Sequence, residues 1–292
     1  MSIAERARKQ VLLSDGAWGT SLQSRGLKIG ECPELWCLNR REETLEVARS
    51  YINAGSDMIQ TNSFGATRFK LEHFDAADRV AEINEEAASI SRKAAGPDHL
   101  VIASVGPTGK IVMMGEVTNE EVYDAFKDQV IALEKGGSDA CCIETMADLE
   151  EARLAVRAAK ENTKLEIIVT FTFEQTVRGD YRTMMGVSPR QMAEEMLRSG
   201  ADIVGTNCGN GMERMAHIVD TMSPVAGQTP ILVHANAGMP VNKGGVDVFP
   251  ETPEQMAENA VPVLEAGARI IGGCCGTTPD HIRALRAMLD KR

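Results

Sequence analysis

The sequence predicts a single-domain (β/α)8 barrel, also called a TIM barrel, over residues 1–292. The length is ordinary for one such barrel. A short phrase also recurs after helical patterns, as in Ala54-Gly55-Ser56-Asp57, Gly136-Gly137-Ser138-Asp139, Ser199-Gly200-Ala201-Asp202 and Ala266-Gly267-Ala268-Arg269. Glycine just past a helix end adopts the left-handed conformation, so each phrase predicts a helix end followed by a strand.

Eight candidate strands are short and almost continuously apolar, as are parallel strands covered by helices. They span residues 11–14, 57–62, 100–105, 139–144, 166–173, 202–207, 230–235 and 269–273. Eight strand–helix units in a chain of this length favour a closed barrel over an open doubly wound sheet.

Helix starts are marked by capping residues. Thr118 with Glu121 fits a capping box, and a Ser or Thr precedes a first-turn proline at Ser188-Pro189, Thr252-Pro253 and Thr278-Pro279. Further helices are predicted over 42–54, 75–95, 148–161 and 211–222. Pro262 predicts a kink or early break in the helix that begins after Thr252. Residues 28–41 are expected to form a long loop at the rim of the barrel.

Composition excludes several classes of function. A net charge of -11 disfavours a nucleic-acid partner, because such binding depends on clustered Lys and Arg. No run approaches the roughly 20 apolar residues of a membrane span, and no export signal is apparent, so we expect a cytoplasmic protein without a membrane partner. The seven cysteines are then expected to be reduced thiols.

Three of these cysteines predict a zinc site. Cys208 follows the sixth strand, and Cys274 and Cys275 close the eighth. Adjacent residues of a regular strand point to opposite faces, so the pair can share one metal only where the backbone bends, which the flanking glycines allow. Three thiolates leave the fourth position of a tetrahedral zinc for substrate. The alternative is that they are small buried side chains.

Polar residues at other strand ends fall on the same rim. Asp15 and Glu144 are acids suited to a substrate ammonium group, although Asp15 could be a turn residue and Glu144 part of an interior ion pair. Asn236 could orient substrate or occupy the metal, or simply form a turn. Cys141, Cys142 and the methionines, Met184 and Met185 included, are expected to fill the core.

A zinc with three thiolate ligands favours alkylation of a substrate thiol. Such a centre carries a formal charge of -1, and a thiol that enters the fourth position loses its proton yet stays electron-rich enough to attack. A hydrolase ordinarily activates water with a more Lewis-acidic zinc that has histidine or carboxylate ligands.

The chain resembles the homocysteine S-methyltransferase family, and most closely the homocysteine-binding barrel of cobalamin-dependent methionine synthases. The similarity runs over nearly the whole length. The matching segments are Asp15-Gly16-Ala17-Trp18-Gly19-Thr20, Thr61-Asn62-Ser63-Phe64-Gly65-Ala66-Thr67, Val105-Gly106-Pro107-Thr108-Gly109, Glu144-Thr145, Gly205-Thr206-Asn207-Cys208, Asn236-Ala237-Gly238 and Gly272-Gly273-Cys274-Cys275-Gly276-Thr277-Thr278-Pro279.

The resemblance implies roles for the matching residues. Cys208, Cys274 and Cys275 would bind zinc, with the sulfur of L-homocysteine as the fourth ligand. Asp15 and Glu144 would bind the amino-acid end of the substrate. Asn236 matches a residue able to approach zinc before substrate does.

The methyl donor is left open. Thr145 stands where betaine-using relatives carry tyrosine, which favours the methionine-synthase branch. We therefore expect methionine to be formed with methylcobalamin or another methyl-corrinoid, supplied by a partner protein. The alternatives are a small donor such as S-methylmethionine or a methylated amine, another thiol acceptor, a non-catalytic homocysteine-binding subunit or sensor, and a structural zinc site.

Overall fold

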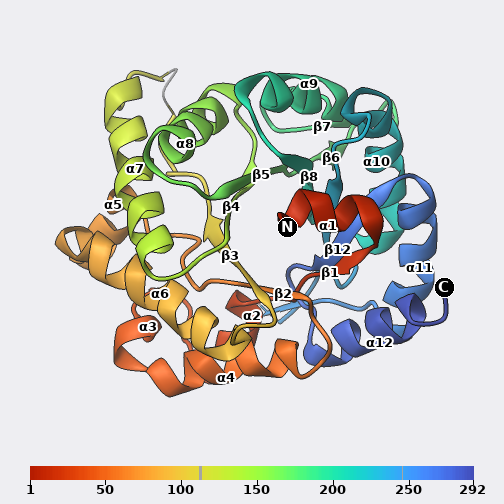
Figure 1. Cartoon of the computed structure of the whole chain (residues 1–292), viewed down its shortest axis with the longest axis horizontal. Coiled ribbons are helices and arrows are strands. Elements are labelled where there is room, and N and C mark those ends of the chain that lie inside the picture. The colour runs from red at the N-terminus through yellow and green to blue at the C-terminus, as the bar shows by residue number, and fades with distance from the viewer. Residues whose placement is uncertain (112–113, 245) are drawn as a thin grey trace.

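A computed structural model describes residues 1–111, 114–244 and 246–292, and its eight parallel strands form the predicted (β/α)8 barrel (Figure 1). The barrel strands are β1 (Leu12–Leu13), β2 (Met58–Gln60), β3 (Leu100–Val105), β4 (Ala140–Met146), β5 (Glu166–Phe171), β8 (Ile203–Gly211), β9 (Ile231–Asn236) and β12 (Ala268–Gly273). Their order in the sheet is β1-β12-β9-β8-β5-β4-β3-β2, so β1 and β2 are its two ends.

Asp57 joins these two ends and closes the barrel. Its backbone N–H donates to the carbonyl oxygen of Leu13 at 2.7 Å, and its Oδ2 accepts from the N–H of Leu13 at 2.7 Å. The backbone and side chain of Asp57 thus join β1 to the start of β2.

Helices surround the sheet, and shorter elements cover its ends (Figure 1). The outer helices are α4 (Arg41–Ile52), α6 (Val80–Ala95), α7 (Asn119–Lys135), α8 (Leu149–Asn162), α9 (Pro189–Ser199), α10 (Met212–Ala226), α11 (Pro253–Glu265) and α12 (Pro279–Leu289). The shorter elements are α1 (Ile3–Lys9), α2 (Gly19–Gln23), α3 (Trp36–Asn39), α5 (Arg68–Leu71), η1 (Glu72–Phe74), η2 (Ala77–Arg79) and the antiparallel hairpins β6 (Glu174–Gln175) with β7 (Tyr181–Arg182) and β10 (Val241–Lys243) with β11 (Val246–Val248).

The inside of the barrel is apolar at one end and polar at the other. At the N-terminal ends of the strands, apolar residues such as Leu12, Ile168 and Leu232 pack with Ile3 and Ala7 of α1, which lies across this opening. Two residues further along the strands the same face carries buried polar side chains, namely those of Gln60, Ser104, Glu144, Thr170 and His234. The apolar layer therefore supports a polar floor beneath the C-terminal rim.

The recurring glycine phrase has the predicted role. Gly55, Gly137, Gly200 and Gly267 all have positive φ, between 98° and 117°, and each lies between a helix and a strand. In three of the four units the phrase continues with an aspartate that binds the preceding strand through both its N–H and its carboxylate. These clamps join Asp57 to Leu13, Asp139 to Val101 and Asp202 to Ile167.

The predicted helix starts are confirmed. Thr118 and Glu121 form a capping box, as do the pairs that begin at Ser188, Thr252 and Thr278. In the last pair, His281 takes the place of the usual glutamate or glutamine, which the sequence pattern did not indicate.

Several predicted boundaries are wrong. The single helix expected over 75–95 begins only at Val80, because Asp75 has a left-handed backbone (φ 52°) and a 3₁₀ turn follows it. Pro262 does not end its helix early, since α11 continues to Glu265; a proline within the final turn removes only one hydrogen bond from the helix. The loop expected over 28–41 contains α3.

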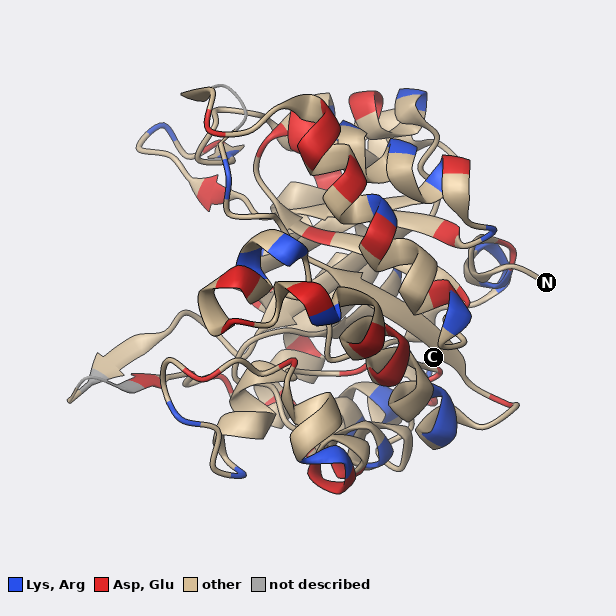
Figure 2. Cartoon of the chain, turned by 90° about the vertical axis from the view of Figure 1, so that its left-hand side faces the viewer, with Lys and Arg blue, Asp and Glu red and all other residues tan. Residues whose placement is uncertain are grey.

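The surface is mixed in charge. Figure 2 shows acidic and basic residues interspersed along the outer helices, where pairs such as Arg41 with Glu86 join neighbouring helices. Met184 and Met185 were expected in the core but are 84% and 39% exposed, because they lie in the rim segment between β7 and α9. Within the described ranges, no helix is both long and apolar enough to cross a membrane.

Candidate metal centre and substrate pocket

The structure brings Cys208, Cys274 and Cys275 together at the C-terminal rim, where their three Sγ atoms lie within 4.8 Å of one another. Cys208 belongs to the irregular last part of β8, and the other two follow the end of β12. All three cysteine residues are partly exposed, whereas Cys141 and Cys142 are fully buried in the core as expected. The cluster can therefore take a metal and still be reached by a small molecule.

Strained backbone shapes this rim. Cys208 and Thr145 both have a φ of +59°, a left-handed conformation that is unfavourable for a β-branched residue such as Thr145. The pairing of β8 with β9 shifts between Asn207 and Gly211, and that of β4 with β5 shifts between Ile143 and Met146. Such strain costs about 1–3 kcal/mol per residue and persists only where its surroundings impose it.

Glycines make the turn that carries the cysteine pair. A Cβ on Gly273 would lie 2.2 Å from Oγ1 of Thr277, and one on Gly276 would lie 2.2 Å from Cγ of Phe249. Gly276 also has a φ of +80°. Oγ1 of Thr277 donates to the carbonyl oxygen of Cys274 at 2.7 Å, which closes the turn. The bend expected from the flanking glycines is present.

The three thiols favour partial ionisation. Hydrogen bonds from Cys274 and then Cys275 hold the pKa of Cys208 well below its usual range. The same contacts raise the pKa of Cys274, and Cys208 raises that of Cys275 to about 12. These contacts favour the ionised form of Cys208 and disfavour that of the other two thiols, and a bound cation would favour ionisation of all three.

Asn236 adds an oxygen beside these thiols. Its side chain is 3% exposed and hydrogen-bonds to Cys208, while its Oδ1 atom has no hydrogen-bond partner among the described residues. A buried amide oxygen without a partner is costly, and a cation bound by the three sulfurs would satisfy it. The donor set of three thiolates and one oxygen fits zinc.

Glu144 lies on the opposite side of the pocket on β4. Its Oε1 accepts from Nε2 of Gln60 at 2.9 Å and from Oγ of Ser104, and its Oε2 is 3.4 Å from Nδ2 of Asn207. Burial raises the pKa of Glu144 from 4.5 to about 7, and the nearby charges of Asp15 and Cys208 add to this. No cation of the described chain pairs with this carboxylate, so a cationic ligand can do so.

Asp15 is placed behind this pocket rather than in its wall. It is fully buried, and its Oδ2 accepts from Nε1 of Trp18 and from the N–H of Gln60, both at 2.9 Å. Burial raises its pKa from 3.8 to about 6. Of the two predicted acids, only Glu144 lines the cavity, while Asp15 fixes Trp18 and Gln60, which do.

The three cysteines and Glu144 line one cavity of about 360 Å³. Trp18 and Phe64 form apolar walls, and Pro33 and Glu34 come from the rim segment that was expected to lie here. This volume is near the lower end for small-molecule sites. The cavity therefore suits a ligand of amino-acid size with a thiol at one end and an ammonium group at the other.

Asn207 is a site residue that the sequence reasoning missed. Its Oδ1 accepts from the N–H of Thr145 at 2.8 Å and from Oγ1 of Thr170 at 2.7 Å, and its Nδ2 donates to Oγ1 of Thr145 at 2.7 Å. It thereby holds the strained Thr145 and links Glu144 to Cys208. The feature of the sequence that could have indicated this role is the position of Asn207 directly before Cys208.

Fold and site together define a barrel protein with a candidate trithiolate metal centre at the C-terminal ends of its strands. The methionine synthase of Mycobacterium leprae is 31% identical over 98% of this chain, and that of Mycobacterium tuberculosis is 30% identical over 96%. The chain spans about a quarter of the length of these relatives, 25% and 24% respectively. The homocysteine methyltransferase MmuM from Escherichia coli, in its metallated form, has the same fold, with a TM-score of 0.78 at 23% identity over 98% of both chains.

The family model for homocysteine S-methyltransferases matches residues 12–289. The chain therefore belongs to the homocysteine S-methyltransferase family, as the sequence motifs predicted.

Proposed function

We propose that this protein transfers a methyl group to the thiol of L-homocysteine and forms methionine, with zinc held by Cys208, Cys274 and Cys275. The observation that carries the proposal is one cavity lined by three clustered thiols and by the buried carboxylate of Glu144, which no cation of the described residues pairs with. Homocysteine carries a thiol and an ammonium group, the two groups that these features bind.

Glu144 would receive the substrate ammonium group. An ammonium ion favours the ionised form of a neighbouring carboxylate, so binding would lower a pKa that burial has raised. Asp15 would contribute a second negative charge from behind, and it holds the Trp18 wall and the backbone of Gln60 in place. Together they fix which end of the substrate faces the thiols.

Other residues of the cavity would arrange the end that receives the substrate sulfur. The strained backbone at Cys208 directs its thiol toward the cysteine pair, and Asn236 supplies an oxygen that a ligand sulfur would displace. Zinc, when bound, supplies a charge that keeps an incoming thiol ionised at neutral pH. The apolar walls formed by Trp18 and Phe64 would keep water from the reacting sulfur.

The likeness to the methionine synthases supports a methyl-corrinoid on a partner protein as the donor. A cavity of about 360 Å³ is too small to enclose a corrin, so the donor would present its methyl group at the mouth of the cavity. S-methylmethionine or a methylated amine is the alternative within the same chemistry.

Two variants test the proposal. Cys274→Ala should lose both zinc and turnover, whereas the matched control Cys141→Ala, which removes a buried core thiol of β4, should keep both. Turnover with a methyl-corrinoid but not with S-methylmethionine would support the donor assignment. An active, metal-free Cys274→Ala enzyme would overturn the zinc mechanism, and tight homocysteine binding without turnover with any donor would indicate a binding subunit.

A further inference from the structure

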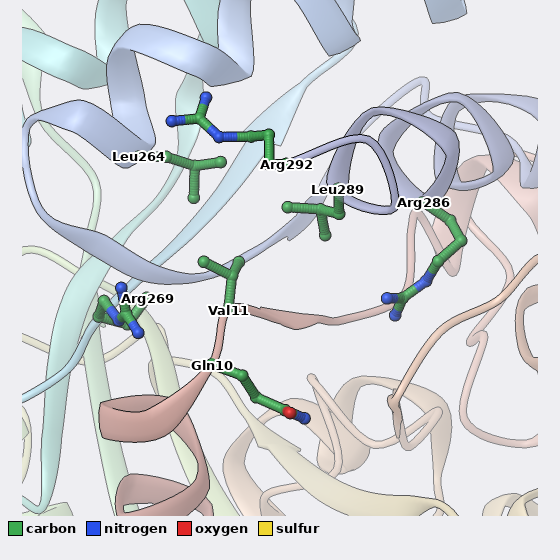
Figure 3. A pocket seen from close by; sticks show the side chains of 7 residues that line it. All are labelled: Gln10, Val11, Leu264, Arg269, Arg286, Leu289 and Arg292. Atoms are coloured by element: carbon green, nitrogen blue, oxygen red, sulfur yellow. The ribbon is translucent and has the colours of Figure 1, made fainter.

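A second pocket of about 390 Å³ lies at the opposite end of the barrel, between the ends of α1, α11 and α12 (Figure 3). Arg269, Arg286 and Arg292 line it, together with the amide of Gln10 and apolar side chains, and no acidic residue is among the described residues of its wall. In a protein of net charge -11, such a pocket is electrostatically unlike the rest of the molecule.

Arg269 is the residue that breaks the repeat of the fold. Asp57, Asp139 and Asp202 occupy the equivalent position in the other three glycine phrases, and each clamps the preceding strand. The fourth phrase has an arginine there, and the ladder between β12 and β9 shifts between Ala268 and Ile270, so Arg269 lies on a bulge. A bulge redirects the side chain of the extra residue, and here the aspartate clamp is replaced by a cation.

The guanidinium of Arg269 is only partly used. Its Nε donates to the carbonyl oxygen of Ala7 at 2.9 Å, one of the last carbonyl groups of α1. Its two terminal nitrogens have no hydrogen bond or ion pair within the described part of the chain. The anchoring of α1 therefore accounts for one of three nitrogens and leaves free the pair that can bind an oxyanion side by side.

The other two arginines differ in their availability. Arg286 already forms ion pairs with two aspartates, since its Nη2 is 2.7 Å from Oδ2 of Asp57 and its Nη1 is 3.9 Å from Oδ1 of Asp290. Arg292 is exposed, and its side chain makes no contact of this kind with the described residues. Figure 3 shows Arg269 and Arg292 on one side of the pocket, with Leu264 and Val11 between them.

We propose that this pocket binds a small organic anion, with its carboxylate or phosphate group on the two free guanidinium nitrogens of Arg269 and its apolar part on Val11, Leu264 and Leu289, while Arg292 adds a positive charge from beyond Leu264. Arg269 is the second residue of β12, which ends directly before Cys274, so the two sites are about 17 Å apart along this strand. The ligand would join α1, α11 and α12 across the closed end of the barrel and is distinct from the methyl-transfer substrates.

Thermal unfolding of the zinc-loaded protein tests this proposal independently of methyl transfer. Inorganic phosphate and pentanoate are added separately at constant ionic strength, with chloride as the reference. Saturating ligand should raise Tm by about 2–4 °C, because it binds the folded state alone. A larger effect of pentanoate would identify an organic carboxylate as the ligand, and a larger effect of phosphate would identify a phosphate group.

Three variants separate binding from structure. Arg269→Gln should weaken probe binding in calorimetry at least tenfold. Arg292→Gln removes a side chain that has no hydrogen bond or ion pair among the described residues, and it should weaken probe binding by a smaller factor. Arg49→Gln, at an exposed position on α4, should bind as the parent protein does. An Arg269→Gln variant that has a lower Tm but the same ligand-induced rise would show that Arg269 only anchors α1. That result, or a parent protein that neither probe stabilises, would overturn the proposal.

Discussion

Replacing Glu144 by glutamine should stabilise the protein and weaken its binding of homocysteine. Burial raises the pKa of Glu144 from 4.5 to about 7. Between these values the folded protein retains a proton that the unfolded chain has lost, so the free energy of unfolding falls as pH rises through this window. At 1.36 kcal/mol per pH unit, the ionised carboxylate costs up to about 3 kcal/mol at pH 8.

The glutamine variant avoids that cost at a small structural loss. Its amide oxygen can still accept from Gln60 and Ser104. In the parent protein, Nδ2 of Asn207 lies 3.4 Å from Oε2 of Glu144, and in the variant this donor would face the amide nitrogen instead. The loss of this contact costs about 1 kcal/mol. The variant should therefore be about 2 kcal/mol more stable than the parent at pH 8 and show no gain at pH 4.5.

Substrate affinity should change in the opposite direction. A hydrogen bond between charged groups contributes about 1.5–3 kcal/mol, so Glu144→Gln should raise the Kd for homocysteine about 10- to 100-fold. In the parent protein, affinity should fall as pH drops below about 7, where Glu144 takes up a proton, whereas the affinity of the variant should not follow this titration.

Urea unfolding at pH 4.5 and pH 8, with calorimetric titration of homocysteine, measures both effects. Glu151→Gln is the matched control, because Glu151 is also a buried acid with a raised pKa but accepts from Thr108 away from the cavity. The control should leave homocysteine affinity unchanged. A Glu144→Gln variant that is less stable at pH 8, or that binds homocysteine as tightly as the parent, would refute this account of the pocket.

Three further predictions concern the rim. Asn207→Ala should cost about 2–3 kcal/mol of stability in urea unfolding, because it leaves the N–H of Thr145 and the hydroxyl of Thr170 unpaired; a cost below 1 kcal/mol would argue against this network. Gly276→Ala should lower zinc affinity at least tenfold in a competition titration, because the new Cβ would lie 2.2 Å from Cγ of Phe249 and because Gly276 has a φ of +80°. Unchanged affinity would show that the turn adapts to the added methyl group. Zinc retention against a chelator should fall steadily as pH decreases, because protons compete for thiols whose pKa values are raised; retention independent of pH would exclude thiolate ligands.

Much of the fold was predictable because its signals are local. The glycine phrases at Gly55, Gly137, Gly200 and Gly267 mark helix ends through their own backbone preference, and the capping box at Thr118 lies within four residues. The start of α6 was misplaced because the left-handed Asp75 ends the preceding turn, and an aspartate in this conformation gives no reliable sequence signal.

The site was predictable to the extent that strand ends meet on one rim. That rule brought the three cysteines and Glu144 together. It could not distinguish Glu144, in the cavity wall, from Asp15 behind it, because this depends on which way the chain turns after β1. Asn207 was missed because its role depends on the strained backbone of Thr145, which only the three-dimensional structure shows.

Zinc-edge X-ray absorption of the purified protein, with and without L-homocysteine, distinguishes a zinc centre that binds the substrate thiol from a structural one. We expect three sulfur neighbours and one lighter atom on the zinc in the free protein, and four sulfur neighbours after homocysteine is added. A first coordination shell that stays the same on addition of homocysteine would contradict this expectation, because the three cysteines would then hold a metal that the substrate thiol does not reach.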